Sequence, residues 1–382
     1  MVFSDGKEKS IEGIILVFEL FAAMSGLRIS LEKSTIFLAG ISNAQRTSII
    51  NRFSLENGNL PVRYLGLPLI AKKMTKADYA PLVEKIKTCI RSWKICHISF
   101  AGRLQLLASV ISGILNFWMA AFQLPNSCIK EVESLCSAFL WSGPILNPRK
   151  AKVSWEDVCK PKVEGGLGLR SLREVNMVCS LKLVWRFLFN MPSLWASWLR
   201  CRYVKGNSFW SLPESPPHSS WIWWRMLKIR IVAQRFYYME VNNGERTSFW
   251  LDRWSSLGRI FDITGSQGFI RLGIPSHYSL DLVWRRRRRK CHRCDRLTDI
   301  ERAIETAKGS RRPRADQSLW QGMNDIFGPN VSTKATWNNI RTALTRKAWS
   351  YLVWFQNATP KYAFITWLAM RKRLSTGECM TA

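Results

Sequence analysis

Three consecutive segments between residues 77 and 142 repeat apolar side chains at the spacing of an α-helix, and this pattern limits the fold more than any other feature. Side chains that recur every three or four positions line one face of a helix. The three apolar faces comprise Leu82, Val83, Ile86, Ile90 and Trp93; Leu104, Leu107, Ala108, Ile111, Leu115 and Trp118; and Ile129, Val132, Leu135, Cys136 and Phe139. The sequence therefore predicts a helical bundle over residues 74–143.

The second of these segments also meets the length criterion for a membrane span. Residues 104–124 carry no charged side chain, and 21 residues of helix could just cross a bilayer. Gln105, Ser109 and Asn116 interrupt the segment, however, and its apolar residues lie on one face. We favour a packed helix of a bundle over a membrane span.

The first 73 residues mix helix and strand patterns. An apolar helical period over residues 11–22 is followed by Gly26, which is typical of a helix end. Residues 35–38 are expected to form a short strand. Ser42 and Gln45 then stand at capping-box spacing and predict the start of a second helix. This opening part of the chain is predicted to be α+β.

Further along, turn residues mark two more extended regions. Proline begins and ends the segment 61–68, which confines it to a short or edge strand. The dipeptide Asn243-Gly244 predicts a hairpin turn between strands at 237–241 and 247–251. The overall expectation is an α+β fold that becomes mainly helical beyond residue 77.

Basic residues greatly outnumber acidic ones. The chain has 57 Lys and Arg against 27 Asp and Glu, a net charge of +30. Such an excess repels itself unless a polyanion neutralises it, so nucleic acid is the expected partner and an anionic membrane surface is the alternative. The local excess is +8 over residues 60–130 and +9 over residues 285–314, a tract we interpret as an exposed basic linker.

The ten cysteines are scattered rather than spaced like a disulfide framework, which favours a reducing compartment. No secretory signal pattern opens the sequence, so we expect an intracellular protein, nuclear or cytoplasmic, and not a secreted one. The nineteen tryptophans are expected mostly in the core, because many fall within apolar runs.

Several segments together resemble the C-terminal portion of plant LINE-type (non-LTR) retrotransposon reverse transcriptases, in the family's order. The segments that carry the resemblance are Met1 to Gly6, Ser25 to Ser34, Tyr64 to Leu69, Ser92-Trp93-Lys94, Ser99 to Leu104, Phe139 to Gly143, Val153-Ser154-Trp155 through Gly165 to Leu169, Asn243-Gly244 through Phe249 to Trp254, Thr336 to Arg341, Thr359 to Tyr362 and Arg373 to Gly377. The resemblance implies a partial polymerase palm at 1–73, a helical thumb at 74–143, a Trp-rich connector at 144–284, the basic linker at 285–315 and a truncated zinc-binding-type domain at 316–382.

The resemblance also assigns candidate binding residues. Lys33 matches the lysine of motif D, although an exposed charge is the alternative. Tyr64, Gly66 and Leu67 match the primer grip, where glycine permits close approach of the primer, and an ordinary edge strand is the alternative. The candidate nucleic-acid-binding residues of the thumb and of the basic tract are Arg91, Lys94, Arg103, Arg285, Arg286, Arg287, Arg288, Arg289 and Lys290.

The chemistry of nucleotide addition requires paired carboxylates that hold two metal ions. No adjacent aspartate pair occurs in the sequence, and Asp5 alone is expected to be a turn residue before Gly6. The resemblance places magnesium at that missing pair and zinc at a Cys/His cluster beyond residue 382. We therefore expect no polymerase activity and no cofactor in this chain.

Two further motifs suggest binding sites only weakly. Cys291 and Cys294 have the spacing of half a zinc site, but a tetrahedral site needs four ligands, and the surrounding arginines would repel the ion. The next cysteine is Cys379. The glycines of residues 165–168 lack the Gly-Lys-Ser/Thr ending of a phosphate loop. We expect neither motif to bind a ligand.

Overall fold

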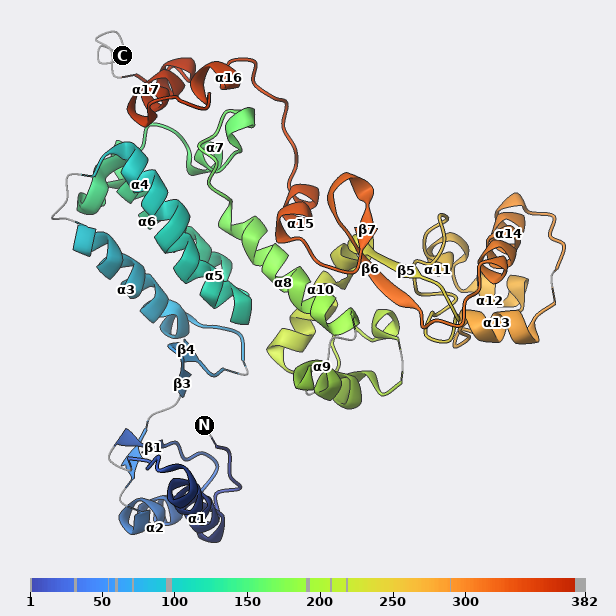
Figure 1. The fold of residues 1–382 in the computed structure, drawn as a ribbon, viewed down its shortest axis with the longest axis horizontal. Coiled ribbons are helices and arrows are strands. Elements are labelled where there is room, and N and C mark those ends of the chain that lie inside the picture. Colours follow the sequence, from blue (N-terminus) through green and yellow to red (C-terminus); the bar gives the residue numbers. More distant parts are fainter. Residues whose placement is uncertain are drawn as a thin grey trace. The chain divides into compact units, whose positions relative to one another are not determined.

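The structure, a computed structural model, describes residues 2–30, 33–53, 55–58, 61–70, 72–93, 98–189, 193–206, 208–217, 219–288 and 290–374. The chain divides into two compact units, Met1–Ala71 and Lys72–Ala382. The fold is α+β and mainly helical, as the sequence predicts (Figure 1). The naming of its parts as palm, thumb and connector stays a prediction.

The described residues of the first unit form two helices and four two-residue strands. Its elements are α1 (Glu8–Ser25), β1 (Thr35–Ile36), α2 (Asn43–Phe53), β2 (Glu56–Asn57), β3 (Arg63–Tyr64) and β4 (Leu67–Pro68). Strands β1 and β2 pair in parallel. A small core forms around Ile11, Leu38 and Ile49, whereas much of the apolar surface of α1 is exposed.

Both predicted helix boundaries of this unit are confirmed. Gly26 ends α1 in the left-handed conformation, with φ 74°. The backbone N–H of Ser42 donates to Oε1 of Gln45 at 3.2 Å, and the backbone N–H of Gln45 donates to Oγ of Ser42 at 3.3 Å. This reciprocal capping box fixes the start of α2.

The single extended segment expected at residues 61–68 is instead a hairpin, so that prediction was wrong. Strands β3 and β4 pair antiparallel, with Tyr64 opposite Leu67. Leu65 and Gly66 form the two-residue turn with φ values of 51° and 84°. A turn of this kind requires positive φ at both central residues, which glycine adopts freely and leucine does not.

The predicted three-helix pattern is confirmed in the second unit. Its first helices are α3 (Lys76–Ser92), α4 (Phe100–Leu106), a π-helical segment (Leu107–Ile111), α5 (Ser112–Ala121) and α6 (Asn126–Ser142). Buried side chains of the middle helix lie on one face, at Leu107, Ile111 and Leu115. Phe100–Ala121 is nevertheless long and apolar enough to cross a membrane, by length and composition, and 28% of its most apolar window is buried.

The rest of this unit surrounds a small antiparallel sheet of order β5-β6-β7. The helices that precede the sheet are α7 (Trp155–Val158), α8 (Leu172–Leu188), α9 (Leu194–Leu199) and α10 (Trp221–Phe236), and β5 is Tyr237–Glu240. Then follow α11 (Ile260–Thr264), α12 (Gln267–Leu272), α13 (Leu280–Arg286), α14 (Asp295–Gly309), β6 (Gln317–Gln321), β7 (Phe327–Gly328), α15 (Thr333–Ile340), α16 (Ser350–Val353) and α17 (Pro360–Met370).

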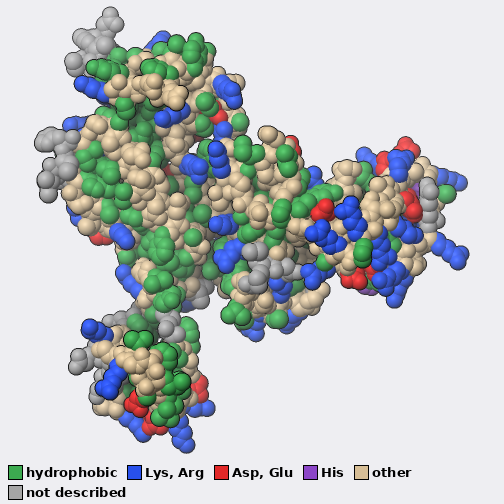
Figure 2. Space-filling view, in the orientation of Figure 1, with side chains coloured by type: hydrophobic (Ala, Val, Ile, Leu, Met, Phe, Trp, Pro, Cys, Tyr) green, Lys and Arg blue, Asp and Glu red, His purple; other side chains and the backbone are tan. Residues whose placement is uncertain are grey.

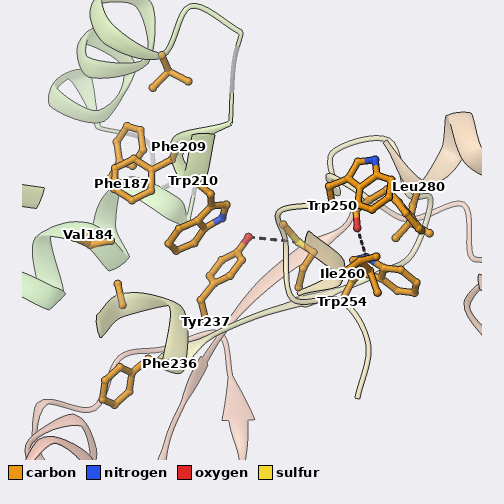
Figure 3. Close-up of a cluster of buried hydrophobic side chains, with 14 of the residues drawn as sticks. Val184, Phe187, Phe209, Trp210, Phe236, Tyr237, Trp250, Trp254, Ile260 and Leu280 are labelled. Carbon is orange, nitrogen blue, oxygen red and sulfur yellow. Dashed lines mark hydrogen bonds between the residues drawn. The ribbon is translucent and has the colours of Figure 1, made fainter. Parts of the chain in front are cut away.

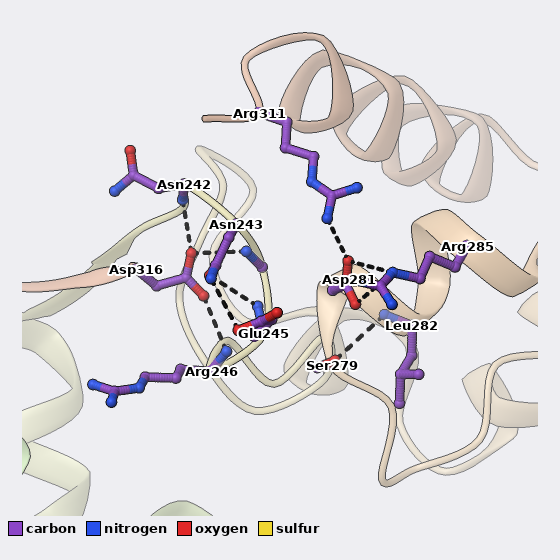
Figure 4. A network of polar contacts seen from close by, with 11 residues as sticks. Asn242, Asn243, Glu245, Arg246, Ser279, Asp281, Leu282, Arg285, Arg311 and Asp316 are labelled. Carbon is purple, nitrogen blue, oxygen red and sulfur yellow. Dashed lines mark hydrogen bonds and ion pairs between the residues drawn. The ribbon is translucent and has the colours of Figure 1, made fainter. Parts of the chain in front are cut away.

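The turn at Asn243-Gly244 exists, but the predicted hairpin around it does not. Gly244 has φ 75°, whereas β5 pairs with β6, whose residues lie more than seventy positions further along the chain. Asp316 holds the turn in place: its carboxylate accepts from the backbone N–H of Asn242 at 2.7 Å and of Gly244 at 2.9 Å (Figure 4). The carboxylate of Asp316 thus accepts hydrogen bonds from backbone N–H groups of the turn, and no paired strand is needed to fix it.

Aromatic side chains dominate the core of the second unit. Trp223, Trp250, Trp320 and Trp367 are among its largest fully buried side chains, which confirms the core interpretation for these residues. Trp210 belongs to the cluster of buried side chains drawn in Figure 3. Its indole N–H donates to the carboxylate of Asp252 at 2.9 Å. Burial raises the pKa of Asp252 to about 6.

Candidate nucleic-acid interface

The hairpin β3–β4 brings together the three residues that the resemblance assigned to a primer grip. Tyr64 is 50% exposed, and Gly66 is also exposed at the turn. Leu67 is half-buried opposite Tyr64. Lys33 is exposed just before β1. Three of these residues are thus exposed and Leu67 is partly exposed, and the binding role of all four stays a prediction.

Asp5 is a turn residue. Its carboxylate accepts from the backbone N–H of Lys7 at 3.2 Å and lies 3.4 Å from the ammonium of the same lysine. A hydrogen bond from Ser10 and the contacts with Lys7 hold the pKa of Asp5 below its usual value. Gly6 follows with φ 77°. The geometry of Asp5 is therefore that of a turn residue before Gly6.

The cations that the resemblance assigns to a thumb have unequal access to a ligand. Arg91 is exposed, but its guanidinium forms an ion pair with Glu84 at 3.0 Å. The guanidinium of Arg103 donates to the carbonyl oxygens of Ile98 at 3.1 Å and Leu140 at 3.3 Å, and burial lowers its pKa. Arg103 thus ties α4 to the end of α6. Lys94 lies outside the described residues.

The basic tract is folded, which corrects the expectation of an exposed linker over residues 285–315. Helix α14 occupies its centre and buries Leu297, Ile300 and Ile304. On the face drawn in Figure 2, acidic side chains lie among the lysines and arginines of this region. The linker prediction was wrong because it counted only charge. The apolar residues of the tract are buried, and its carboxylates form ion pairs within the same unit.

Carboxylates engage several of the arginines in this tract. Arg285 lies 2.9 Å from Asp281, which also accepts from Arg311 at 2.7 Å (Figure 4). Arg287 pairs with the buried Glu301 through Nη1 and Nη2 of its guanidinium. Arg286, Arg288 and Lys290 are exposed, and Arg289 lies outside the described residues. Only part of the tract is therefore open to phosphate.

The residues described around Cys291 and Cys294 do not fit a zinc ion. Both thiols are exposed, and the imidazole of His292 is bound to Glu301 at 2.8 Å. Within the described ranges no group of three or more His, Cys, Asp or Glu side chains could hold a metal. Cys379 lies outside them.

The glycine-rich loop at 165–168 has a role that sequence reasoning missed. The carbonyl oxygen of Gly165 accepts from the indole N–H of Trp367 at 2.9 Å and from Nη2 of Arg371 at 2.7 Å. Beside it, Glu164 is buried and pairs with Arg341 at 2.6 Å. The loop therefore binds the segment that contains α15 and α17. The positive φ of Gly165, 89°, is the local reason for glycine there.

A family described as zinc-binding in reverse transcriptase matches residues 331–382. The described part of this match contains α15, α16 and α17, the helices adjoining the contacts to the glycine loop. The described part of the matching segment, residues 331–374, is thus packed into the second unit.

Two relatives from Arabidopsis thaliana were found. The putative ribonuclease H protein At1g65750 is 31% identical over 195 residues, which are 50% of this chain and 31% of the relative. The uncharacterized mitochondrial protein AtMg00310 is 30% identical over 138 residues, which are 36% of this chain and 88% of the relative. The chain therefore spans about a third of the first relative and most of the second.

Proposed function

Because this chain belongs to the same family as the Arabidopsis mitochondrial protein AtMg00310 and is a reverse-transcriptase-related protein, we propose that it is a portion of a plant LINE-type retrotransposon reverse transcriptase. In this proposal the chain binds nucleic acid without regard to sequence and does not polymerise nucleotides by itself. The parent activity would be RNA-templated DNA synthesis, and the chain would act inside the cell, in the nucleus or cytoplasm.

The excess of cations over carboxylates carries the binding part of the proposal. With 57 Lys and Arg against 27 Asp and Glu, one-to-one pairing leaves at least 30 cations without a carboxylate. Phosphates release condensed counterions when such cations neutralise them, and this release favours binding at low salt. Contacts of this kind position a nucleic acid without reading its bases.

The absence of an adjacent aspartate pair from the sequence supports the inactive part. Two-metal catalysis needs carboxylates that hold both ions at the reacting phosphate. Asp5, the one aspartate near the matching position, is an exposed turn residue held by Lys7.

Anisotropy of labelled single strands, DNA duplexes and RNA–DNA hybrids tests the binding. If about five duplex phosphates are neutralised, affinity should fall roughly 500-fold between about 50 and 200 mM salt. A flat response, or far tighter binding to anionic vesicles, contradicts the proposal and favours a membrane-associated basic protein. One observation favours this membrane-associated alternative: the helix Phe100–Ala121 is long and apolar enough to cross a membrane.

Primer extension on an RNA template with Mg²⁺ or Mn²⁺ tests the missing activity. We expect no incorporation above a heat-denatured control. Template-dependent incorporation that survives repurification would show that this chain is catalytic by itself.

A further inference from the structure

One groove of the second unit is lined by cations and by no acidic side chain among the described residues. Its volume is about 360 Å³, and its walls come from α8, α5 and α15. Arg170, Lys182 and Arg186 supply the charges, and Asn116 and Thr333 supply neutral polar groups on the facing helices. Val175, Val178 and Leu183 complete an apolar floor. We call this site the α8 groove.

The cations of the α8 groove differ from those that local charge excess singled out. Arg170, Lys182 and Arg186 are all exposed, and none of them forms an ion pair within the described part of the chain. By contrast, Arg91 and Arg285 each lie within 3.0 Å of a carboxylate. An unpaired cation can neutralise a phosphate without first giving up a protein partner.

Aromatic rings stack against the two arginines of the α8 groove. Arg170 lies over the ring of Trp337 at 5.3 Å, and Arg186 lies over Trp195 at 6.0 Å. The indole N–H of Trp337 donates to Glu174 at 2.7 Å, so that ring is itself fixed. Stacking lowers the side-chain entropy that an arginine loses on binding a ligand.

We propose that the α8 groove binds the phosphate backbone of single-stranded nucleic acid, a proposal that rests on the proposed function and names its site. Lys182 and Arg186 are one helical turn apart on the same face of α8. A positively charged groove is the geometry that follows the backbone of a single strand. A strand can lie between the walls that α5, α8 and α15 supply, whereas a flat lipid surface cannot enter between them, so nucleic acid is the better occupant.

The decisive variant combines Arg170→Gln, Lys182→Gln and Arg186→Gln. Each single-strand phosphate contributes about 0.7 to the slope of log K against log salt, so three lost contacts should lower the slope by about 2. Between about 50 and 200 mM salt, the variant should then lose roughly 20-fold less affinity than the wild type. A long unlabelled single strand should compete better than a duplex of equal phosphate content.

A matched control removes three charges from ion pairs instead. Arg91→Gln, Arg285→Gln and Arg302→Gln change the net charge equally, but each of these arginines is paired to a carboxylate. The control should alter the slope much less than the groove variant. Lys182→Glu serves as a second groove variant, because Lys182 is exposed and stacks on no ring in the described residues.

A chemical footprint gives an independent measurement on the wild-type chain. Cys179 lines the α8 groove and is half-buried, whereas Cys201 is exposed elsewhere. Bound oligodeoxythymidine should slow alkylation of Cys179 and leave Cys201 unchanged, as read by peptide mass spectrometry.

The outcomes separate the site from the function. Equal slopes for the groove variant and the control, or unchanged alkylation of Cys179, overturn the α8 groove while nucleic-acid binding stands. No binding of any nucleic acid by the wild type overturns both. Anionic vesicles that bind through Lys182, with no competition from the single strand, assign the groove to lipid headgroups instead.

Discussion

Replacing Gly166 by alanine should loosen the contact between the glycine loop and the C-terminal helices. A Cβ atom at Gly166 would lie 2.0 Å from the carbonyl oxygen of Lys160, where real Cβ atoms essentially never come within 3.0 Å. The obstacle is backbone rather than the end of a side chain, so the loop itself must move by about 1 Å.

The structure gives the size of the effect. The backbone N–H groups of Leu167 and Gly168 donate to Val158 and Lys160, each at 3.0 Å, and a shift of the loop weakens both. Two hydrogen bonds at about 1 kcal/mol each, with about 1 kcal/mol or more of strain, give roughly 3 kcal/mol. The melting temperature of a unit this large should fall by about 5 °C.

Hydrogen exchange shows where the change acts. The carbonyl of Gly165 holds Trp367 and Arg371, so amides of α17 should exchange faster in Gly166→Ala while α3 stays protected. Gly113→Ala is the matched control, because a Cβ there meets nothing within 4 Å in helical backbone. It should stabilise by up to about 1 kcal/mol. If Gly166→Ala melts and exchanges like Gly113→Ala, the loop does not hold the C-terminal helices.

Three further predictions concern charge and metal. Burial raises the pKa of Asp252 from 3.8 to about 6, so ionisation of this carboxyl opposes folding as the pH rises through that window. The free energy of unfolding of the wild type should therefore fall by up to about 3 kcal/mol relative to Asp252→Asn between about pH 4 and 6. Paired denaturant titrations measure this difference, and a difference that does not change with pH refutes the reasoning. Arg287→Gln leaves the buried Glu301 short of its partner and should destabilise by about 3 kcal/mol or more, whereas the exposed Arg286→Gln should stay within about 0.5 kcal/mol in the same titrations. Elemental analysis of untagged protein should find less than stoichiometric zinc, and one zinc per chain that disappears in Cys291→Ser would establish a site there.

Local interactions explain why much of the fold could be predicted. The capping box of Ser42 and Gln45 and the helix end at Gly26 depend only on residues within a few positions. The apolar faces of α3 and α6 follow from helical spacing alone. Such features are written into short stretches of sequence, and these predictions agreed with the structure.

Long-range pairing explains what could not be predicted. The strand β5 pairs with β6 across a separation of about eighty residues, and Asp316, not a neighbouring strand, fixes the turn at Asn243-Gly244. Likewise, nothing near Gly165 in the sequence indicates that Trp367 and Arg371 will bind its carbonyl. The glycines themselves were the available clue, since close approach of backbone is one reason for them.

The same reasoning decides where nucleic acid should bind. Charge counted along the sequence selects residues 285–314 as the binding tract. Asp281, however, lies just outside that window and forms ion pairs with both Arg285 and Arg311. Within the window, Glu301 forms an ion pair with Arg287. On α8 the local excess is small, yet the carboxylate of Glu174 accepts from the indole N–H of Trp337 and forms no ion pair with a cation of the described residues. Which cations lack a carboxylate partner therefore depends on the fold and not on charge counted along the sequence. It follows that, for each charge removed, substitutions in the α8 groove should change the salt dependence of binding more than substitutions at Arg285 or Arg287.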